Sequence, residues 1–378
     1  MKKVARLLII SVLTMICALG VAACDGGGKT DAKGLVCKKM NGDDFYTVVS
    51  YGAEEGVTAL DISAAAKAKY GETTVVGRIR TGAFDGNSSL KEVIVTDNAG
   101  DGVALTIDEG AFRNMRGLEK ITLPFIGANA NSDAYINETA PATGDEVKAT
   151  DKARCFGYIF GEEESDVSSA VTFTYGDGSE QTATFYIPVA LTEITVKAEN
   201  EINIPMYAFC GLSRIATVNL EGKIKAIGVS AFKNMTGLNK VNIPASVKVI
   251  YDNAFEGTTA LKVFGDNGFK FDEGSLLEEI KTAAFKGTKL NAFDISGTQV
   301  KTIGDYAFAE SKILNSVKFG TSVQTIGAYL FADCDDLTEL TYTGTMAQCG
   351  EININDNWNA SSKLEKIVCS DGDIDLVI

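Results

Sequence analysis

A template of apolar positions recurs every 23 residues along much of the chain, and the coil around Phe232 shows it most plainly. Ile227 lies five residues before Phe232, and Leu238 lies six residues after it. Val241 and Ile243 then follow at alternating positions, which is the pattern of a short strand with one buried face. A fixed period of about 20 to 30 residues is typical of a solenoid, in which each coil buries its apolar side chains against the next.

The template can be followed through eight phenylalanines, and an isoleucine lies five residues before each of them. Alanine precedes every one of these phenylalanines except the last, which follows a leucine. The last six are separated by 23, 23, 30, 23 and 23 residues, so the coil length is nearly constant. We expect each Ala-Phe pair to form a tight corner with the aromatic ring inside the coil. The eight anchors are Phe84, Phe112, Phe209, Phe232, Phe255, Phe285, Phe308 and Phe331.

Breaks in the period predict how the chain is divided. The second and third anchors are separated by 97 residues, which requires a long insertion between two coils. Runs rich in β-branched and aromatic residues, at 45–49 and 57–62, predict strands ahead of the first coil. The expected segments are an N-terminal cap at 36–78, a solenoid at 79–342, a long insertion near 125–190, a shorter insertion near 265–275 and a C-terminal cap at 343–378.

One residue lies between the two buried positions of each strand and should face outward. These residues form a polar ladder across neighbouring coils, and none of them is aromatic, so the ladder offers no stacking platform for sugar rings. Such a surface can bind a macromolecular partner, or it can be simply the solvated face of a sheet. The candidate binding residues are Thr122, Thr195, Asn219, Asn242, Asp294, Lys318 and Thr341.

The N-terminus has the pattern of an export signal. Three basic residues precede an apolar run at 7–19, and small residues follow it. A single transmembrane helix is the alternative, because the run approaches the roughly 20 residues that span a bilayer. Gly20 and the glycines at 26–28 favour a cleaved signal instead.

Val21-Ala22-Ala23-Cys24 resembles a bacterial lipobox. In that family the signal is cut before the cysteine, which then carries the lipid. The resemblance implies a signal peptide at 1–23, lipidation of Cys24 and a flexible tether at 24–35. It also implies export and lipid anchoring at the bacterial cell membrane, with the rest of the chain exposed at the cell surface.

The repeat resembles the BspA-like form of the leucine-rich repeat. The matching residues include Leu238, Val241, Ile243 and Pro244 in one coil, and Ala254-Phe255 in the next. The resemblance implies an α/β-type leucine-rich-repeat solenoid. Such a solenoid is strand-rich with little helix, and it is a right-handed curved repeat of about 23 residues per coil.

The resemblance also implies a function, because BspA-like proteins are associated with attachment to host or bacterial surfaces. We therefore expect adhesion or protein–protein recognition through the solenoid surface, with host or bacterial surface proteins as partners. The alternative is a surface protein that binds or processes carbohydrate through the insertion at 125–190. The position of Cys349 departs from the family pattern, which usually has an aromatic residue there.

The charge balance limits the partners. Residues 1–23 carry three of the 35 Lys and Arg residues, so the remainder has 32 against 50 Asp and Glu, a net charge of −18. A strongly acidic chain repels nucleic acid and anionic lipid surfaces. We expect no nucleic-acid partner, and the membrane is reached only through the lipid.

Candidate chemistry is sparse. The chain has no histidine and no CxxC pair, which removes imidazole bases and the usual zinc sites, so we expect no enzyme, no metal and no cofactor. Fifty acidic residues offer many carboxylate pairs, but nothing selects two of them for glycoside hydrolysis. The acidic segments 161–166 and 176–179 match no full calcium-binding pattern, and we interpret them as solvated loops.

Six cysteines lie beyond the lipobox. Cys210 and Cys334 are 124 residues apart, too many coils for a disulfide, and we expect buried thiols there. Cys349 and Cys369 lie in the same terminal segment. They are the pair for which we expect a disulfide, with free thiols as the alternative.

Overall fold

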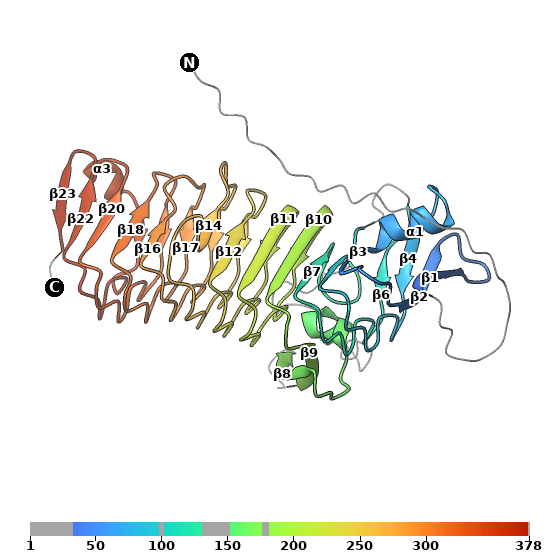
Figure 1. The fold of residues 1–378 in the computed structure, drawn as a ribbon. Helices are drawn as coiled ribbons and strands as arrows, with labels where there is room; N and C mark the ends of the chain where they lie inside the picture. Colours follow the sequence, from blue (N-terminus) through green and yellow to red (C-terminus); the bar gives the residue numbers. More distant parts are fainter. Residues whose placement is uncertain (1–32, 98–101, 131–151, 176–180, 377–378) are drawn as a thin grey trace, which may run out of the picture. The chain divides into compact units, whose positions relative to one another are not determined.

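The computed structural model describes residues 33–97, 102–130, 152–175 and 181–376 (Figure 1). The chain divides into two compact units, 1–31 and 32–378, and every element described below belongs to the second. The lipobox with Cys24 lies outside the described residues, as do 176–179 and most of the polar stretch of the long insertion.

The N-terminal part begins with β1 (Gly34–Lys39) and β2 (Tyr46–Gly52), which pair antiparallel. The expected strand at 57–62 is shorter than predicted, because helix α1 (Ile62–Tyr70) begins inside it. Asp61 caps this helix, and its Oδ1 accepts a hydrogen bond from the Ala64 N–H at 2.9 Å. A cap followed by alanines favours a helix over a strand.

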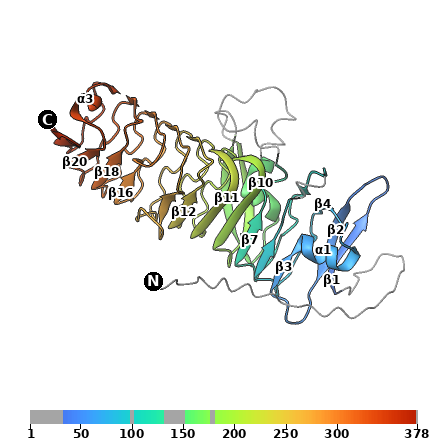
Figure 2. The ribbon, with the colours of Figure 1, turned by 90° about the horizontal axis from the view of Figure 1, so that it is seen from above.

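Parallel strands then follow one another, one per coil, and we call them the ladder strands (Figure 2). They form one continuous series up to β14 and a second series that β23 (Gly372–Asp375) closes in antiparallel orientation. The first series is β3 (Ala59–Asp61), β5 (Glu92–Ile94), β7 (Lys120–Leu123), β10 (Glu193–Ile204), β11 (Thr217–Ile227), β12 (Lys240–Ile243) and β14 (Phe269–Phe271). The second is β16 (Ala292–Asp294), β18 (Ser316–Phe319), β20 (Glu339–Tyr342) and β22 (Lys366–Cys369).

A second set of short parallel strands contains the isoleucines that precede each corner. β10 and β11 are long enough to take part in both sets, and the 12-stranded sheet that they connect contains the first ladder series and five of the short strands. The short strands are β4 (Val76–Ile79), β6 (Thr106–Ile107), β13 (Val249–Ile250), β15 (Glu279–Ile280), β17 (Thr302–Ile303), β19 (Thr325–Ile326) and β21 (Asn353–Ile354). The expected strand-rich solenoid with little helix is confirmed.

The anchor phenylalanines form a stacked column in the core, and all of them are at most 1% exposed. The ring of Phe255 lies 4.7 Å from that of Phe232 and 5.2 Å from that of Phe285, with interplanar angles of 7° and 3°. Each corner also bonds to the next one. The Phe255 N–H donates to the Ala284 carbonyl at 2.7 Å, and the Phe285 N–H donates to the Ala307 carbonyl at 2.8 Å.

Every corner contains two residues with positive φ, one two positions before the phenylalanine and one two positions after it. Around Phe285 these are Ala283 at φ 54° and Gly287 at φ 66°. Only glycine adopts this left-handed region without steric cost. The backbone therefore favours the Gly, Asn and Asp residues that follow most of the anchors.

The long insertion is built into the stack. In the corner column, η3 (Phe156–Phe160) lies between the second and third anchors: the Phe112 N–H donates to the Ile159 carbonyl, and the Phe156 N–H donates to the Ala208 carbonyl, both at 2.9 Å. A short turn, η2 (Lys152–Arg154), precedes it. The ladder strands are uninterrupted there, since β7 pairs directly with β10.

The insertion also supplies a two-stranded hairpin, β8 (Ser168–Tyr175) and β9 (Gln181–Pro188). Its inner face contributes Phe173 and Phe185 to the core.

The shorter insertion after Phe255 replaces a ladder strand. The template would place Phe264 beside Val241, but Phe269 from the insertion occupies that position and Phe264 only bridges to Phe269. Lys270 consequently lies opposite Asn242.

The C-terminal segment contains α3 (Met346–Cys349), whose N-terminus has a capping box between Thr345 and Gln348. The disulfide expected between Cys349 and Cys369 is not formed. Both thiols are free and buried, and they are hydrogen-bonded to each other. Cys210 and Cys334 are also free, as expected, although Cys210 is only half-buried. Within the described residues, no helix is both long enough and apolar enough to span a bilayer.

Candidate functional site

The seven candidate residues lie on the ladder strands, and six of them form two registered runs. Thr122, Thr195 and Asn219 lie side by side across β7, β10 and β11. Asp294, Lys318 and Thr341 do the same across β16, β18 and β20. All seven are half-buried while their neighbours in the strand are buried, so their side chains share the outward face, which we call the ladder face.

The Asn242 side chain is hydrogen-bonded to the backbone of the preceding ladder strand, β11. Its Oδ1 accepts from the Leu220 N–H at 3.0 Å, and its Nδ2 donates to the Leu220 carbonyl at 2.8 Å. The same Nδ2 lies 3.3 Å from Asp272 Oδ2. Both donor hydrogens and the acceptor oxygen of this side chain are therefore directed at its own chain.

The side chains of two further candidates also form hydrogen bonds within the chain. Asn219 Nδ2 donates to Thr195 Oγ1 and to Glu193 Oε1, both at 3.3 Å. Asp294 Oδ1 accepts from the Ser296 N–H at 2.8 Å and from its hydroxyl at 2.6 Å. These contacts hold neighbouring coils and turns together, and they reduce what the residues can offer a partner.

Thr122, Lys318 and Thr341 are different. Within the described part of the chain, their side chains form no hydrogen bond or ion pair, although Lys318 lies beside Asp294 in the strand register. They are the members of the ladder whose polar atoms are directed only at solvent.

A flanking column of charges was not predicted. The first residue of every ladder strand except β14 also faces outward, and several of these are charged and paired: Lys120 Nζ lies 3.0 Å from Glu193 Oε2, and Lys366 Nζ lies 3.3 Å from Glu339 Oε2. The alternation of side chains in each strand would have identified this column, since it lies two residues before the ladder.

The acidic segment at 161–166 is solvent-exposed, as its sequence suggested, and several of its carboxylates also meet basic side chains. Arg113 bridges it to the preceding coil, with one nitrogen 2.6 Å from Glu163 Oε2 and another 2.8 Å from Asp85 Oδ2. Arg116 lies 3.4 Å from Asp166. No cluster of His, Cys, Asp or Glu suited to a metal occurs among the described residues. The segment fastens the insertion to the coils.

Burial is the main cause of the raised pKa of several cysteine thiols. Burial raises the pKa of the Cys210 and Cys349 thiols to about 11 and that of Cys334 to about 12. Thiols with such pKa values stay protonated at neutral pH and are poor nucleophiles.

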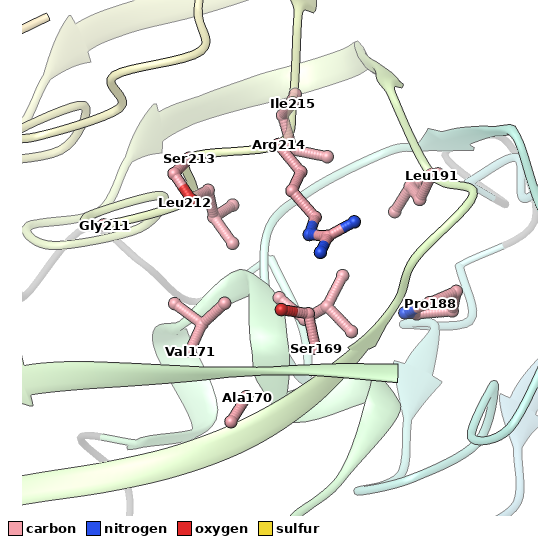
Figure 3. Close-up of a pocket in the computed structure, with 11 residues that line it drawn as sticks. Ser169, Ala170, Val171, Pro188, Leu191, Gly211, Leu212, Ser213, Arg214 and Ile215 are labelled. Atoms are coloured by element: carbon pink, nitrogen blue, oxygen red, sulfur yellow. The ribbon is translucent and has the colours of Figure 1, made fainter. Parts of the chain in front are cut away.

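A small cavity lies between the hairpin and the coil that follows it (Figure 3). Its volume is about 60 Å³, and its walls come from β8, the end of β9 and the turn at 211–215. The Arg214 side chain points into it above Ser169 (Figure 3). No signal in the sequence indicated this cavity, because one of its walls belongs to the insertion, which does not follow the repeat template.

Comparison with known proteins gives a family. The family model described as the BspA type leucine rich repeat region matches this chain six times, within residues 72–140, 169–264 and 269–371. No curated protein matches the chain.

Three solved structures have the following similarities. The leucine rich repeat protein TpLRR of T. pallidum is 21% identical over 53% of this chain and 94% of its own, with a TM-score of 0.36. A leucine-rich repeat protein from Bacteroides ovatus is 16% identical over 90% of this chain and 76% of its own, with a TM-score of 0.40. A leucine rich cell surface protein from Faecalibacterium prausnitzii is 16% identical over 91% and 89%, with a TM-score of 0.28.

The six copies of the family model cover most of the chain, and their spans contain all seven ladder residues and all eight anchor phenylalanines. The chain therefore belongs to the BspA-type leucine-rich-repeat family.

Proposed function

We propose that the protein recognises other proteins through the ladder face while a lipid on Cys24 holds it at the outside of a bacterial membrane. The partners are surface proteins of a host or of another bacterium, and the outcome is adhesion. The observation that carries the proposal is the registered run Asp294, Lys318 and Thr341, with the matching run that begins at Thr122.

The ladder face suits a protein partner for three reasons. It presents rows of small polar side chains at a regular spacing of about 4.8 Å, which matches the hydrogen-bonding scale of another polypeptide. Its flanking charges are paired within the chain, which leaves Lys318 as an unpaired contact. Solenoids use such extended surfaces to contact macromolecules.

The binding test uses the residues whose side chains do not support the fold. The full chain, purified in detergent, captures surface proteins from candidate host and bacterial cells. Changing Lys318→Ala and Thr341→Ala together should lower capture by about tenfold or more, as expected for loss of an interface centre. The matched control, Lys312→Ala with Gln324→Ala, alters two exposed residues of neighbouring segments away from the ladder strands. Equal capture by both variants would contradict the proposal.

A glycan-binding assay distinguishes the proposed function from the alternative, which is carbohydrate recognition by the insertion. If immobilised glycans bind the chain equally well with and without the ladder substitutions, and a change in the insertion abolishes that binding, carbohydrate recognition by 125–190 becomes the better assignment.

Anchoring has an independent test. Cys24→Ala should prevent acylation and normal removal of the signal, which shifts the mass of the mature chain and its share in the membrane fraction. An unchanged mass and an unchanged membrane fraction would reject the lipid anchor and leave the ladder face unaffected.

A further inference from the structure

We infer that the cavity beneath Arg214 binds the free carboxyl terminus of a partner polypeptide that ends in a small apolar residue. The inference rests on the proposed function, because it takes the partner to be a protein. It concerns a different surface, formed by the insertion hairpin and the turn at 211–215 (Figure 3).

The cavity has an apolar floor. Ile187, Leu191, Leu212 and Ile215 line it and are all at most 4% exposed, while Val171 is half-buried. With a volume of about 60 Å³, it has room for one small side chain and not for an aromatic ring or a folded loop. Apolar groups that enter it are removed from water, which favours binding at about 25 cal/mol per Å² of buried surface.

The rim of the cavity is cationic. Arg214 reaches over the cavity, and within the described residues its guanidinium has no hydrogen-bond or ion-pair partner (Figure 3). In a chain with a large excess of acidic residues, an arginine left unpaired beside an apolar floor selects for an anion. A guanidinium matches a carboxylate with two parallel hydrogen bonds, which adds geometric specificity.

Two further donors border the same space. The Ser169 hydroxyl points towards the cavity and bonds to no other residue of the described part (Figure 3). Ala170 also lines the cavity, and its register partner on β9 is Tyr186. The Tyr186 N–H points away from β8, since it donates to the Gly161 carbonyl at 3.0 Å. Ala170 and Tyr186 therefore form a pair without mutual backbone bonds, and the Ala170 N–H points away from β9.

The C-terminal residue of a polypeptide can contact the apolar floor and the cationic rim of the cavity at the same time. Its single Cα carries the carboxylate for Arg214 and the apolar side chain for the floor. An internal Asp or Glu would have to bring two flanking backbone segments into a cavity of this size. The ligand is therefore a C-terminal residue such as Val or Ala, and the preceding residues extend out of the cavity.

The test compares two forms of one peptide. A tetrapeptide that ends in Val is titrated into the full chain in detergent, as the free acid and as the C-terminal amide, by isothermal titration calorimetry. The acid should bind at least about tenfold more tightly, the usual effect of a hydrogen bond to a charged group. Arg214→Gln should remove that difference, and Arg214→Lys should restore part of it.

Arg80→Gln is the matched control. Arg80 is also exposed and has no side-chain partner within the described residues, but it lies in the N-terminal coils. This variant should keep the preference for the acid.

Three results would overturn the inference: equal affinity for acid and amide, an acid preference that survives Arg214→Gln, or no detectable peptide binding. Isovalerate, which has the same apolar and carboxylate groups without a peptide chain, must bind more weakly than the tetrapeptide; equal affinity would also reject a chain terminus as the ligand. None of these results bears on the capture of surface proteins by the ladder face, which the Lys318 and Thr341 substitutions test independently.

Discussion

Asn242 continues the pairing of two ladder strands by bonding both backbone groups of Leu220 with one side-chain amide. β11 and β12 are in main-chain register only at Thr217 and Val218, opposite Lys240 and Val241. The amide therefore replaces the next rung of the sheet. A residue selected from the sequence as a binding candidate also holds two coils together.

Asn242→Ala should lower the free energy of unfolding by about 1–3 kcal/mol, because both backbone groups of Leu220 lose their partner. Thr341→Ala is the control, since it occupies the same ladder position but bonds to no other described side chain, and it should stay within about 0.5 kcal/mol of the parent. Urea unfolding followed by circular dichroism measures both. Similar losses in the two variants would show that the Asn242 bonds contribute no stability of their own.

The repeat was predictable because it depends on local spacing. An isoleucine and a phenylalanine five residues apart define a corner, and their buried positions follow directly from the 23-residue period. The bonds of Asn242 were not predictable in this way, because they depend on how far neighbouring strands separate. Phe269 shows the same limit: the insertion near 265–275 was recognised, but its strand displaces Phe264 from the ladder only through packing in three dimensions.

The corner backbone gives a second test. Gly287 has φ +66°, and a Cβ added there would meet only the Gly257 nitrogen, at 3.9 Å. Gly287→Ala therefore introduces backbone strain with no serious clash, and it should cost about 1–2 kcal/mol.

Gly297→Ala is the matched control for that strain. Gly297 has no positive φ, and an added Cβ would meet no atom within 4 Å. It should be neutral or stabilise by up to about 1 kcal/mol, because alanine restricts the unfolded chain. Equal thermal midpoints for the two variants would argue against a left-handed corner at Gly287.

Arg113 should hold the insertion against the coils. Its side chain is 25% exposed and bridges Asp85, which is 36% exposed, and Glu163, which is 70% exposed, so Arg113→Ala removes one partly buried ion pair and one pair at the surface. Hydrogen exchange in 161–175 should accelerate by about fivefold, corresponding to a loss of about 1 kcal/mol. Arg116→Ala removes a single pair at 3.4 Å from a side chain that is 64% exposed, and it should change exchange little. The reverse order would assign the attachment to Arg116.

Alkaline pH should destabilise the protein through its buried thiols. The pKa of Cys334 is raised from 9.0 to about 12, so the folded state holds this proton more tightly than the unfolded chain does. Its contribution to stability is fully present below pH 9 and is lost as the pH rises from 9 towards 12.

Cys334→Ala should therefore flatten the fall of unfolding free energy across that range, in addition to a constant loss from the hydrogen bond that its thiol donates to the Phe308 carbonyl at 3.1 Å. Thr321→Ala, an exposed change, should leave the slope as in the parent. Parallel slopes in the parent and in Cys334→Ala would show that this thiol does not titrate with unfolding.

The main-chain hydrogen bonds between successive corners follow the same pattern in each coil, so the fold can accommodate a different number of coils. The Phe285 N–H donates to the Ala307 carbonyl of the next coil, and the Phe308 N–H donates to the Leu330 carbonyl of the coil after that, so the segment between them has the same main-chain bond at both ends. The gain or loss of 23 residues there changes the number of coils and preserves this pattern of main-chain bonds. The length of the solenoid can thus change by whole coils.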